Sequence, residues 1–180
     1  MDDVSLVHSH ECYIESFNRA VDAVARERRY IAFVEGPTLS QTAAFVRHVL
    51  DGNGVQQLAV ATGNVVVGWC DIVWNQQEGF RHVGRLGMAL LSQYRGRGLG
   101  RRLAHVTLQA ARESGIERVE LDVFTSNTPA ISLYKSLGFV EEGIKRHARK
   151  LDGRYDDNLF MALLFDSNNS DTPEDRPIQR

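Results

Sequence analysis

The chain has 180 residues, 43% of them hydrophobic, and a formal net charge of −2, which is ordinary for a globular protein with one sizeable core. This charge gives no basic surface for nucleic acid or for an anionic membrane, so a small-molecule partner is favoured by elimination. The acidic start has no apolar signal core, and no apolar run approaches the ~20 residues of a membrane span. Cys12 and Cys70 have no C-x-x-C spacing, which fits a reducing, cytoplasmic setting.

Apolar periodicity and turn-forming residues predict a mixed chain of strands and helices. In order, we expect a strand at 4–8, a helix at 11–27, an apolar segment at 30–37, a helix from Thr38 or Ser40 to 50, strands at 56–62, 64–74 and 82–91, a helix from 99 to Ser114-Gly115, a strand at 119–124, a helix from Thr128 to Gly138, and strands at 139–149 and 154–165. Thr128 is expected to cap its helix, with Pro129 in the first turn. The pattern predicts one α/β domain at 1–165 and a mobile polar tail at 166–180.

Between Leu86 and Leu103, an apolar strand pattern changes to alternating glycines and then to a helix pattern. The first N–H groups of a helix have no partner within it and carry the positive end of its dipole, so they bind anions. Glycines at 96, 98 and 100 remove Cβ atoms that would keep a diphosphate from these amides. Four arginines surround the glycines: Arg95, Arg97, Arg101 and Arg102. The segment therefore predicts a diphosphate site.

The spacing of the glycines disfavours two other interpretations. A triphosphate-binding loop requires Lys-Ser or Lys-Thr after the last glycine, and neither is present. A dinucleotide fingerprint requires G-x-G-x-x-G, whereas Gly96, Gly98 and Gly100 are spaced G-x-G-x-G. A tight turn with solvated arginines is the remaining alternative.

Arg95-x-x-Gly98-x-Gly100 resembles the acetyl-CoA diphosphate motif (R/Q)-x-x-G-x-(G/A) of the GNAT superfamily of N-acetyltransferases. Gln93-x-x-Gly96-x-Gly98 fits equally well, so the register is open by two residues. Downstream, the run from Asn127 to Phe139 resembles the family's second signature, N-x-x-A-(I/V)-x-(L/F)-Y-x-x-x-G-F, and follows a predicted strand. The resemblance covers roughly residues 55–165 well and the N-terminal half loosely.

The resemblance implies a GNAT-like α/β (α+β) domain, with a mixed sheet of about six to seven strands and about four helices. Its fourth and fifth strands would splay apart, with acetyl-CoA between them. Carried over by motif position, strand backbone for the pantetheine and acetyl groups would come from Met88, Ala89 and Leu90. The diphosphate cradle would be Gly96, Arg97, Gly98, Leu99, Gly100 and Arg101, with Arg95 opening the motif. Asn127 would contact pantetheine, and Tyr134 would face the sulfur.

The chemistry of acetyl transfer agrees with these roles. The oxyanion formed when an amine attacks a thioester needs a donor, and the departing thiolate needs a proton or a hydrogen bond. Tyrosine has an ordinary pKa of about 10, so Tyr134 is a donor at neutral pH; its alternative role is packing between helix and sheet. Cys70 suggests an acyl-cysteine, but a lone strand cysteine is more often a core residue, so we favour direct transfer.

The general base is open among three carboxylates or a water chain. Asp122 resembles in position a glutamate of several family members but is one methylene shorter. Glu120 lies on the same strand face, and Glu35 precedes Gly36-Pro37 in the N-terminal half. Each is as well explained as a solvated or ion-paired carboxylate.

We therefore expect a cytoplasmic, acetyl-CoA-dependent N-acetyltransferase that acts on a small or amino-acid-like primary amine by direct attack in a ternary complex. The alternatives are a protein N-terminal or lysine acetyltransferase and a catalytically silent CoA-binding sensor. No metal is expected, because the six histidines include no H-E-x-x-H. A homodimer is consistent with the resemblance. The identity of the acceptor stays open.

Overall fold

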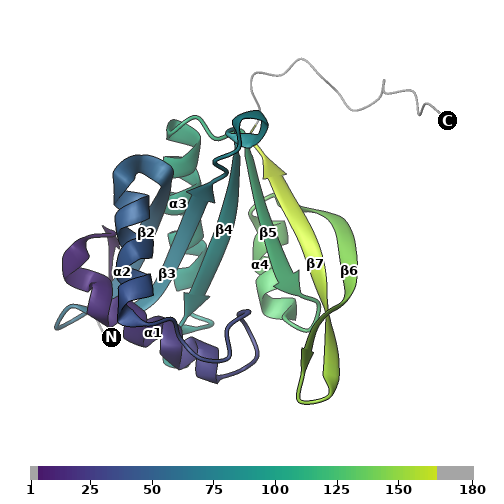
Figure 1. Ribbon diagram of the computed structural model, residues 1–180, viewed down its shortest axis with the longest axis horizontal. Helices are drawn as coiled ribbons and strands as arrows, with labels where there is room; N and C mark the ends of the chain where they lie inside the picture. The colour runs from purple at the N-terminus through teal and green to yellow at the C-terminus, as the bar shows by residue number, and fades with distance from the viewer. Residues whose placement is uncertain (1–3, 166–180) are drawn as a thin grey trace.

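The computed structural model describes residues 4–165, so the predicted polar tail at 166–180 lies outside the described residues. The strands are β1 (Ser5–His8), β2 (Gly54–Ala61), β3 (Val65–Trp74), β4 (Val83–Leu90), β5 (Arg118–Phe124), β6 (Val140–Leu151) and β7 (Arg154–Leu164). The α-helices are α1 (Ile14–Arg26), α2 (Leu39–His48), α3 (Leu99–Glu113) and α4 (Thr128–Ser136). The strands form one mixed sheet in the order β1-β2-β3-β4-β5-β7-β6 (Figure 1), which confirms the predicted fold class.

Strands β4 and β5 run parallel and pair at one end only. Their register covers residues 83–85 of β4 and 118–120 of β5. Beyond that point β4 stays paired with β3 as far as Leu90, and β5 stays paired with β7 as far as Phe124. The two halves of the sheet therefore diverge, as Figure 1 shows, and the expected splay of the fourth and fifth strands is confirmed.

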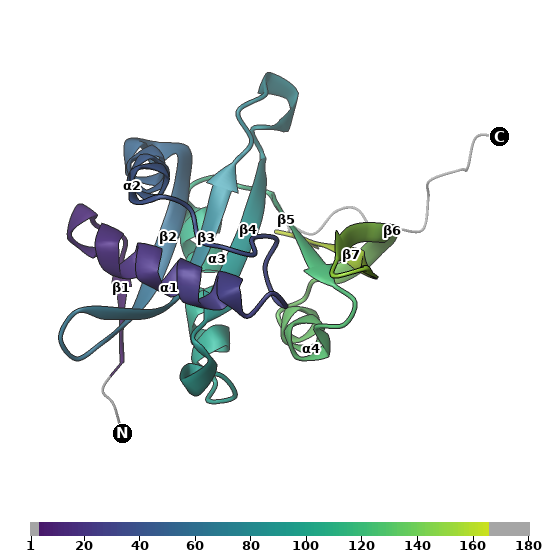
Figure 2. The same cartoon turned by 60° about the horizontal axis from the view of Figure 1, so that its bottom comes forward.

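Helices cover both faces of the sheet because alternate strand residues enter different cores. Trp69 of β3 packs in one core with Phe17 and Val24 of α1. Its neighbour Cys70 lies in the other core with Leu103 of α3. Figure 2 shows α1 in front of the sheet and α3 behind it. Because neighbouring strand residues point to opposite faces, the position of each residue along its strand shows whether its side chain lies on the α1 face or the α3 face of the sheet.

Most predicted elements appear where the sequence places them, with differences at their ends. The apolar segment at 30–37 forms a loop. Thr38 caps α2 through a reciprocal pair of hydrogen bonds with Gln41, as expected. The cap of α4 is Asn127 and not Thr128, because the Asn127 side chain accepts a hydrogen bond from the amide of Ala130 at 3.4 Å. Among residues 4–165, no helix combines the length and apolar character needed to cross a bilayer.

Candidate active site

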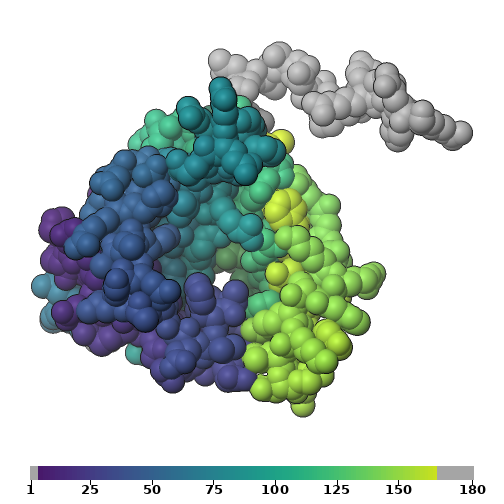
Figure 3. All heavy atoms as spheres, in the orientation of Figure 1, coloured from purple at the N-terminus to yellow at the C-terminus, as the bar shows by residue number. Residues whose placement is uncertain are grey.

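A groove of about 730 Å³ opens where β4 and β5 separate. The strand walls include Met88, Ala89 and Leu90 of β4 and Asp122, Val123 and Phe124 of β5. Helix α4 contributes Ala130, Leu133 and Tyr134, and the loop between α1 and α2 (residues 27–38, the α1–α2 loop) contributes Tyr30, Ile31 and Ala32. In Figure 3 an opening lies between the N-terminal half of the molecule and the β6–β7 half. The groove thus joins segments from across the chain.

The glycine-rich loop forms one end of this groove. Gly96 and Gly98 have positive φ angles of 71° and 76°, and Gly98 is the N-cap of α3. A Cβ atom at either position would meet no heavy atom within 4 Å, so open space lies before their backbone. Gly100 already belongs to α3, where a Cβ would contact Leu133 and Met88 at 3.4 and 3.5 Å. The backbone at the start of α3 therefore fits a diphosphate.

Arg95 lines the groove but is tied to the α1–α2 loop. Its guanidinium donates to both carboxylate oxygens of Glu27 at 2.7 and 2.5 Å and lies over the Tyr30 ring, 4.4 Å from its centre. Its Nε donates to the carbonyl of Leu90 at 2.9 Å. Arg95 therefore connects β4, the glycine loop and the α1–α2 loop.

Three further predicted cradle residues have different surroundings. Arg101 lines the groove and donates to Ser136 Oγ of α4 at 2.7 Å. Arg97 does not line it, and its guanidinium lies 5.9 Å from the centre of the Tyr94 ring. The Leu99 side chain is buried in the core, so only its backbone is placed for a diphosphate. The structure brings Arg101 and the glycines together in the groove lining and leaves Arg97 outside it.

Tyr134 and Asn127 line the groove from α4 and its N-cap. Tyr134 is 6% exposed, and its ring packs 5.7 Å from that of Phe139. Burial raises the pKa of the Tyr134 hydroxyl above its ordinary value, so the group stays protonated at neutral pH. The geometry accommodates both a donor role toward the groove and a packing role.

Cys70 lies in the core and is fully buried. Burial raises the pKa of its thiol, which keeps it neutral and makes it a poor nucleophile. This favours the core role over an acyl-cysteine. Among residues 4–165, no three His, Cys, Asp or Glu side chains are grouped to hold a metal ion.

Asp122 is the one of the three candidate bases that lines the groove. Its side chain is 10% exposed and is held by two cations: Oδ2 contacts Arg85, and Oδ1 accepts from Lys145 at 2.9 Å. Glu120 lies outside the groove lining and bonds to Arg118 at 2.7 Å. Both carboxylates are therefore held in ion pairs with positively charged side chains.

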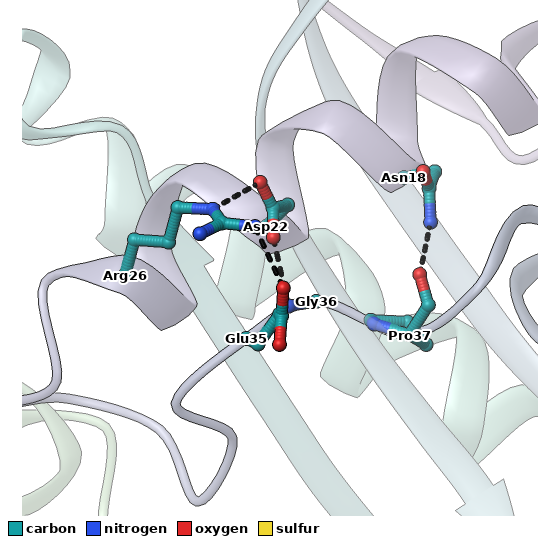
Figure 4. Close-up of polar contacts among 6 residues, drawn as sticks. All are labelled: Asn18, Asp22, Arg26, Glu35, Gly36 and Pro37. Carbon is teal, nitrogen blue, oxygen red and sulfur yellow. Dashed lines mark hydrogen bonds and ion pairs between the residues drawn. The ribbon is translucent and has the colours of Figure 1, made fainter.

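Glu35 does not reach the groove. Its side chain is 72% exposed and accepts a hydrogen bond from Arg26 of α1 at 3.0 Å. Arg26 also binds Asp22, whose other oxygen accepts from the Gly36 amide at 2.9 Å (Figure 4). These contacts fasten the end of the α1–α2 loop to α1, so Glu35 has a structural place rather than one beside β4 and β5.

Two residues that the sequence-based candidates omit either line the groove or contact its lining residues. Asn158 of β7 lines it, and within residues 4–165 its buried Oδ1 has no hydrogen-bond partner. Arg149 of β6 donates to the Ile31 carbonyl at 3.5 Å and lies 3.9 Å from the centre of the Phe124 ring. These residues come together only in the folded chain, so the sequence does not mark them as site residues. The one available indication is that Arg149 lies just before the predicted turn of the last hairpin.

A groove between splayed strands that ends at a glycine-rich helix N-terminus defines a protein that binds an extended, diphosphate-bearing substrate. The model of the acetyltransferase (GNAT) family matches residues 11–139. The chain therefore belongs to the GNAT family, and it is an acetyl-CoA-dependent N-acetyltransferase.

Individual relatives agree with this assignment. The L-amino acid N-acetyltransferase AaaT of Escherichia coli is 32% identical over 115 residues, which are 63% of this chain and 71% of AaaT. The L-methionine sulfoximine/L-methionine sulfone acetyltransferase of Pseudomonas aeruginosa is 30% identical over 97 residues, 54% of this chain and 56% of that enzyme. The phosphinothricin acetyltransferase of Sinorhizobium meliloti, solved with acetyl-CoA, has the same fold with a TM-score of 0.84 at 17% identity, covering 94% of this chain and 92% of that one.

Proposed function

We propose that the chain transfers the acetyl group of acetyl-CoA to the primary amine of a small, amino-acid-like acceptor by direct attack in a ternary complex. The observation that carries this proposal is the continuous groove, which has the glycine loop at one end and Tyr134 along its α4 wall. Arg85 and Asp122 line the same groove on its two strand walls, so both substrates have a place beside each other.

The residues present fit acetyl-CoA. Beyond Arg85 the edge of β4 is not paired with β5, so the backbone groups of Met88 and Ala89 that do not pair with β3 are available to the amides of pantetheine, while the Leu90 carbonyl accepts from Arg95. Asn127 lies across the groove from this edge, at the start of α4. The amides at the start of α3 suit the diphosphate, and Arg101 adds a positive charge nearby.

In the reaction, the amine nitrogen forms the C–N bond while the thioester C–S bond breaks and leaves its electron pair on sulfur. A backbone N–H of β4 suits the developing negative charge on the carbonyl oxygen. The buried, protonated hydroxyl of Tyr134 suits the sulfur, to which it would donate a hydrogen bond or its proton. Because the Cys70 thiol is buried and neutral, it is a poor nucleophile for the thioester, which favours direct transfer over an acetylated cysteine.

Charges at the groove support an acceptor that carries a carboxylate beside its amine. Arg85 and Lys145 flank Asp122, so both signs of charge occur within one small area. Guanidinium and ammonium groups bind a carboxylate strongly through charge-assisted hydrogen bonds. AaaT is named for L-amino acids, which agrees with this choice.

The mouth of the groove favours a small acceptor over an extended peptide. Arg149 bridges to Ile31, and Arg28 bonds to Asp152 in the turn between β6 and β7 at 2.8 Å. The α1–α2 loop and the β6–β7 hairpin therefore meet across this end. A protein N-terminal or lysine acetyltransferase would need this contact to open so that a peptide could enter. A silent CoA-binding sensor would need no proton donor such as Tyr134.

An amine panel, followed by release of the free CoA thiol, tests the proposal. We expect turnover with L-amino acids such as L-phenylalanine. The matched amine without the carboxylate, phenethylamine, should react about tenfold or more slowly, because a charge-assisted hydrogen bond contributes about 1.5–3 kcal/mol. Faster reaction with peptide N-termini would favour the protein acetyltransferase, and no thiol release with any amine would favour the sensor.

The proposal also includes a cytoplasmic location and a homodimer, without a metal ion or nucleic acid. Cys12 and Cys70 are both free thiols, which suits a reducing compartment. Strand β6 lies at the edge of the sheet with Val140 and Ile144 58% and 53% exposed. Such an edge is suited to pairing with a second chain.

A further inference from the structure

We infer that Asp71 of β3 is the general base that takes the proton from the acceptor amine. This inference rests on the acetyl transfer proposed above. It replaces the three carboxylates indicated by the sequence, because Glu35, Glu120 and Asp122 are all held in ion pairs. Asp71 is not itself a lining residue, but its neighbour Gly87 on β4 is.

Asp71 lies beside the groove at a position where β4 has no side chain. It pairs with Gly87 of β4, and Gly87 lines the groove. A Cβ atom built on Gly87 would lie 3.2 Å from Asp71 Oδ1. The carboxyl group of Asp71 therefore occupies space that a side chain of β4 would otherwise fill.

Asp71 and Asp122 belong to the same face of the sheet, on opposite sides of the groove. Trp69, two residues before Asp71, packs with its ring centre 5.5 Å from that of Phe17 on α1, and alternate strand residues share a face. Leu121 and its alternate neighbour Val123 enter the other core, which turns Asp122 toward the α1 side. An acceptor over this face would have one carboxyl group on each side.

Asp71 differs from the other acidic groups near the groove because it has no ion pair within residues 4–165. The other carboxylates there all bind arginine or lysine, namely Glu27, Glu120, Asp122 and Glu142. An unpaired carboxylate is free to take up a proton.

The neighbour of Asp71 on β2 leaves a hydrogen bond unmade. Gln56 pairs with Asp71 in the register and is 3% exposed. Its Oε1 accepts from Ser9 Oγ at 2.6 Å, but in the described part of the chain its buried Nε2 has no partner. A buried amide in this state suits a water molecule or a substrate atom beside Asp71.

Burial raises the pKa of Asp71 to about 7. Charged groups on the elements around this face pair with one another: Arg85 of β4 with Asp122, and Arg26 of α1 with Asp22 and Glu35. A base is most effective when its pKa lies near the working pH. The two aspartates thus have different surroundings: Asp122 is held in two ion pairs, whereas Asp71 has none in the described part of the chain.

The proposed step balances. The Asp71 carboxylate takes one proton from the acceptor ammonium, directly or through one water, and leaves a neutral amine with a lone pair. That pair forms the C–N bond and leaves a positive charge on the nitrogen, the C–S bond breaks with its electrons on sulfur, and the nitrogen loses its second proton to water. Sulfur takes a proton from solvent, or from Tyr134, which then regains one from solvent. Asp71 then returns its proton to water.

Asp71→Asn tests this role. With an L-amino acid acceptor at pH 7, we expect kcat to fall about 100-fold, the usual scale of general base catalysis, with the acetyl-CoA Kd unchanged within about twofold. An O-alkylhydroxylamine is uncharged at neutral pH, so the variant should lose only a few-fold with it. Glu15→Gln, at a carboxylate of α1 that is 75% exposed, is the matched control and should behave as wild type.

The wild-type enzyme supplies a second measurement that does not depend on how the variant folds. Its kcat/KM with an amino acid should fall about tenfold per pH unit below pH 7, because Asp71 becomes protonated there. This fall of kcat/KM below pH 7 should be absent when the wild-type enzyme acts on the O-alkylhydroxylamine. In Asp71→Asn with an amino acid, the fall should begin at the higher pKa of the acceptor amine.

Equal activity of Asp71→Asn and wild type, equal losses with both acceptors, or the same fall of kcat/KM below pH 7 with both acceptors would overturn the role of Asp71. A wild-type enzyme that acetylates no amine would instead defeat the proposed function. The two failures are therefore distinguishable.

Discussion

Gly98→Asp is expected to weaken acetyl-CoA binding about 100-fold, which corresponds to about 2.7 kcal/mol of binding free energy. Gly98 caps α3 with φ of 76°, and open space lies before its backbone. An aspartate there would fill this space and place a negative charge against the diphosphate. The positive φ also strains any residue with a Cβ at this position, so the control must carry the same backbone strain. Isothermal titration calorimetry with acetyl-CoA measures the loss.

Gly63→Asp provides the matched control for Gly98→Asp. Gly63 lies in the turn between β2 and β3, has φ of 78°, and likewise has no heavy atom within 4 Å of an added Cβ. The substitution adds the same charge and a similar backbone strain away from the groove. We expect normal acetyl-CoA affinity. Normal affinity in Gly98→Asp as well would contradict a diphosphate site at the start of α3.

Tyr134→Phe is expected to lower kcat about 100-fold while the acetyl-CoA Kd stays within about threefold. The substitution keeps the ring against Phe139 and removes only the hydroxyl. The loss should therefore fall on departure of the thiolate rather than on binding. Stopped-flow or steady-state assays of free thiol, together with calorimetry, separate kcat from affinity.

Tyr13→Phe, which removes a hydroxyl outside the groove lining, should leave kcat unchanged. The melting temperature of Tyr134→Phe should stay close to that of wild type, since the packing is conserved. If kcat of Tyr134→Phe equals that of wild type, the hydroxyl is not the donor, and Tyr134 serves only in the helix–sheet contact.

The local parts of the fold could be predicted because they depend on residues close in sequence. Alternating glycines mark the entry to α3, and Asp152-Gly153 marks the turn between β6 and β7. The cap of α4 was misplaced by one residue because Asn127 and Thr128 both favour caps. The splay of β4 and β5 was expected from the family resemblance alone, since periodicity does not show where strand pairing ends.

Charge partners could not be predicted because they are set by tertiary structure. Arg95 was expected at the diphosphate, but Glu27, 68 residues away in sequence, takes its guanidinium. Asp122 and Glu120 look alike on their strand, yet the register of the sheet places only Asp122 in the groove. The sequence does not point to Asp71, because its proposed role as a base depends on its pairing with Gly87 of β4, which only the sheet register shows.

A crystal structure with bound acetyl-CoA tests the central claim most directly. We expect diphosphate oxygens within about 3 Å of main-chain nitrogens between residues 96 and 101, with the thioester between β4 and β5 next to Tyr134. Acetyl-CoA bound at another surface, or a glycine loop covered by another segment of the chain in that complex, would contradict the account.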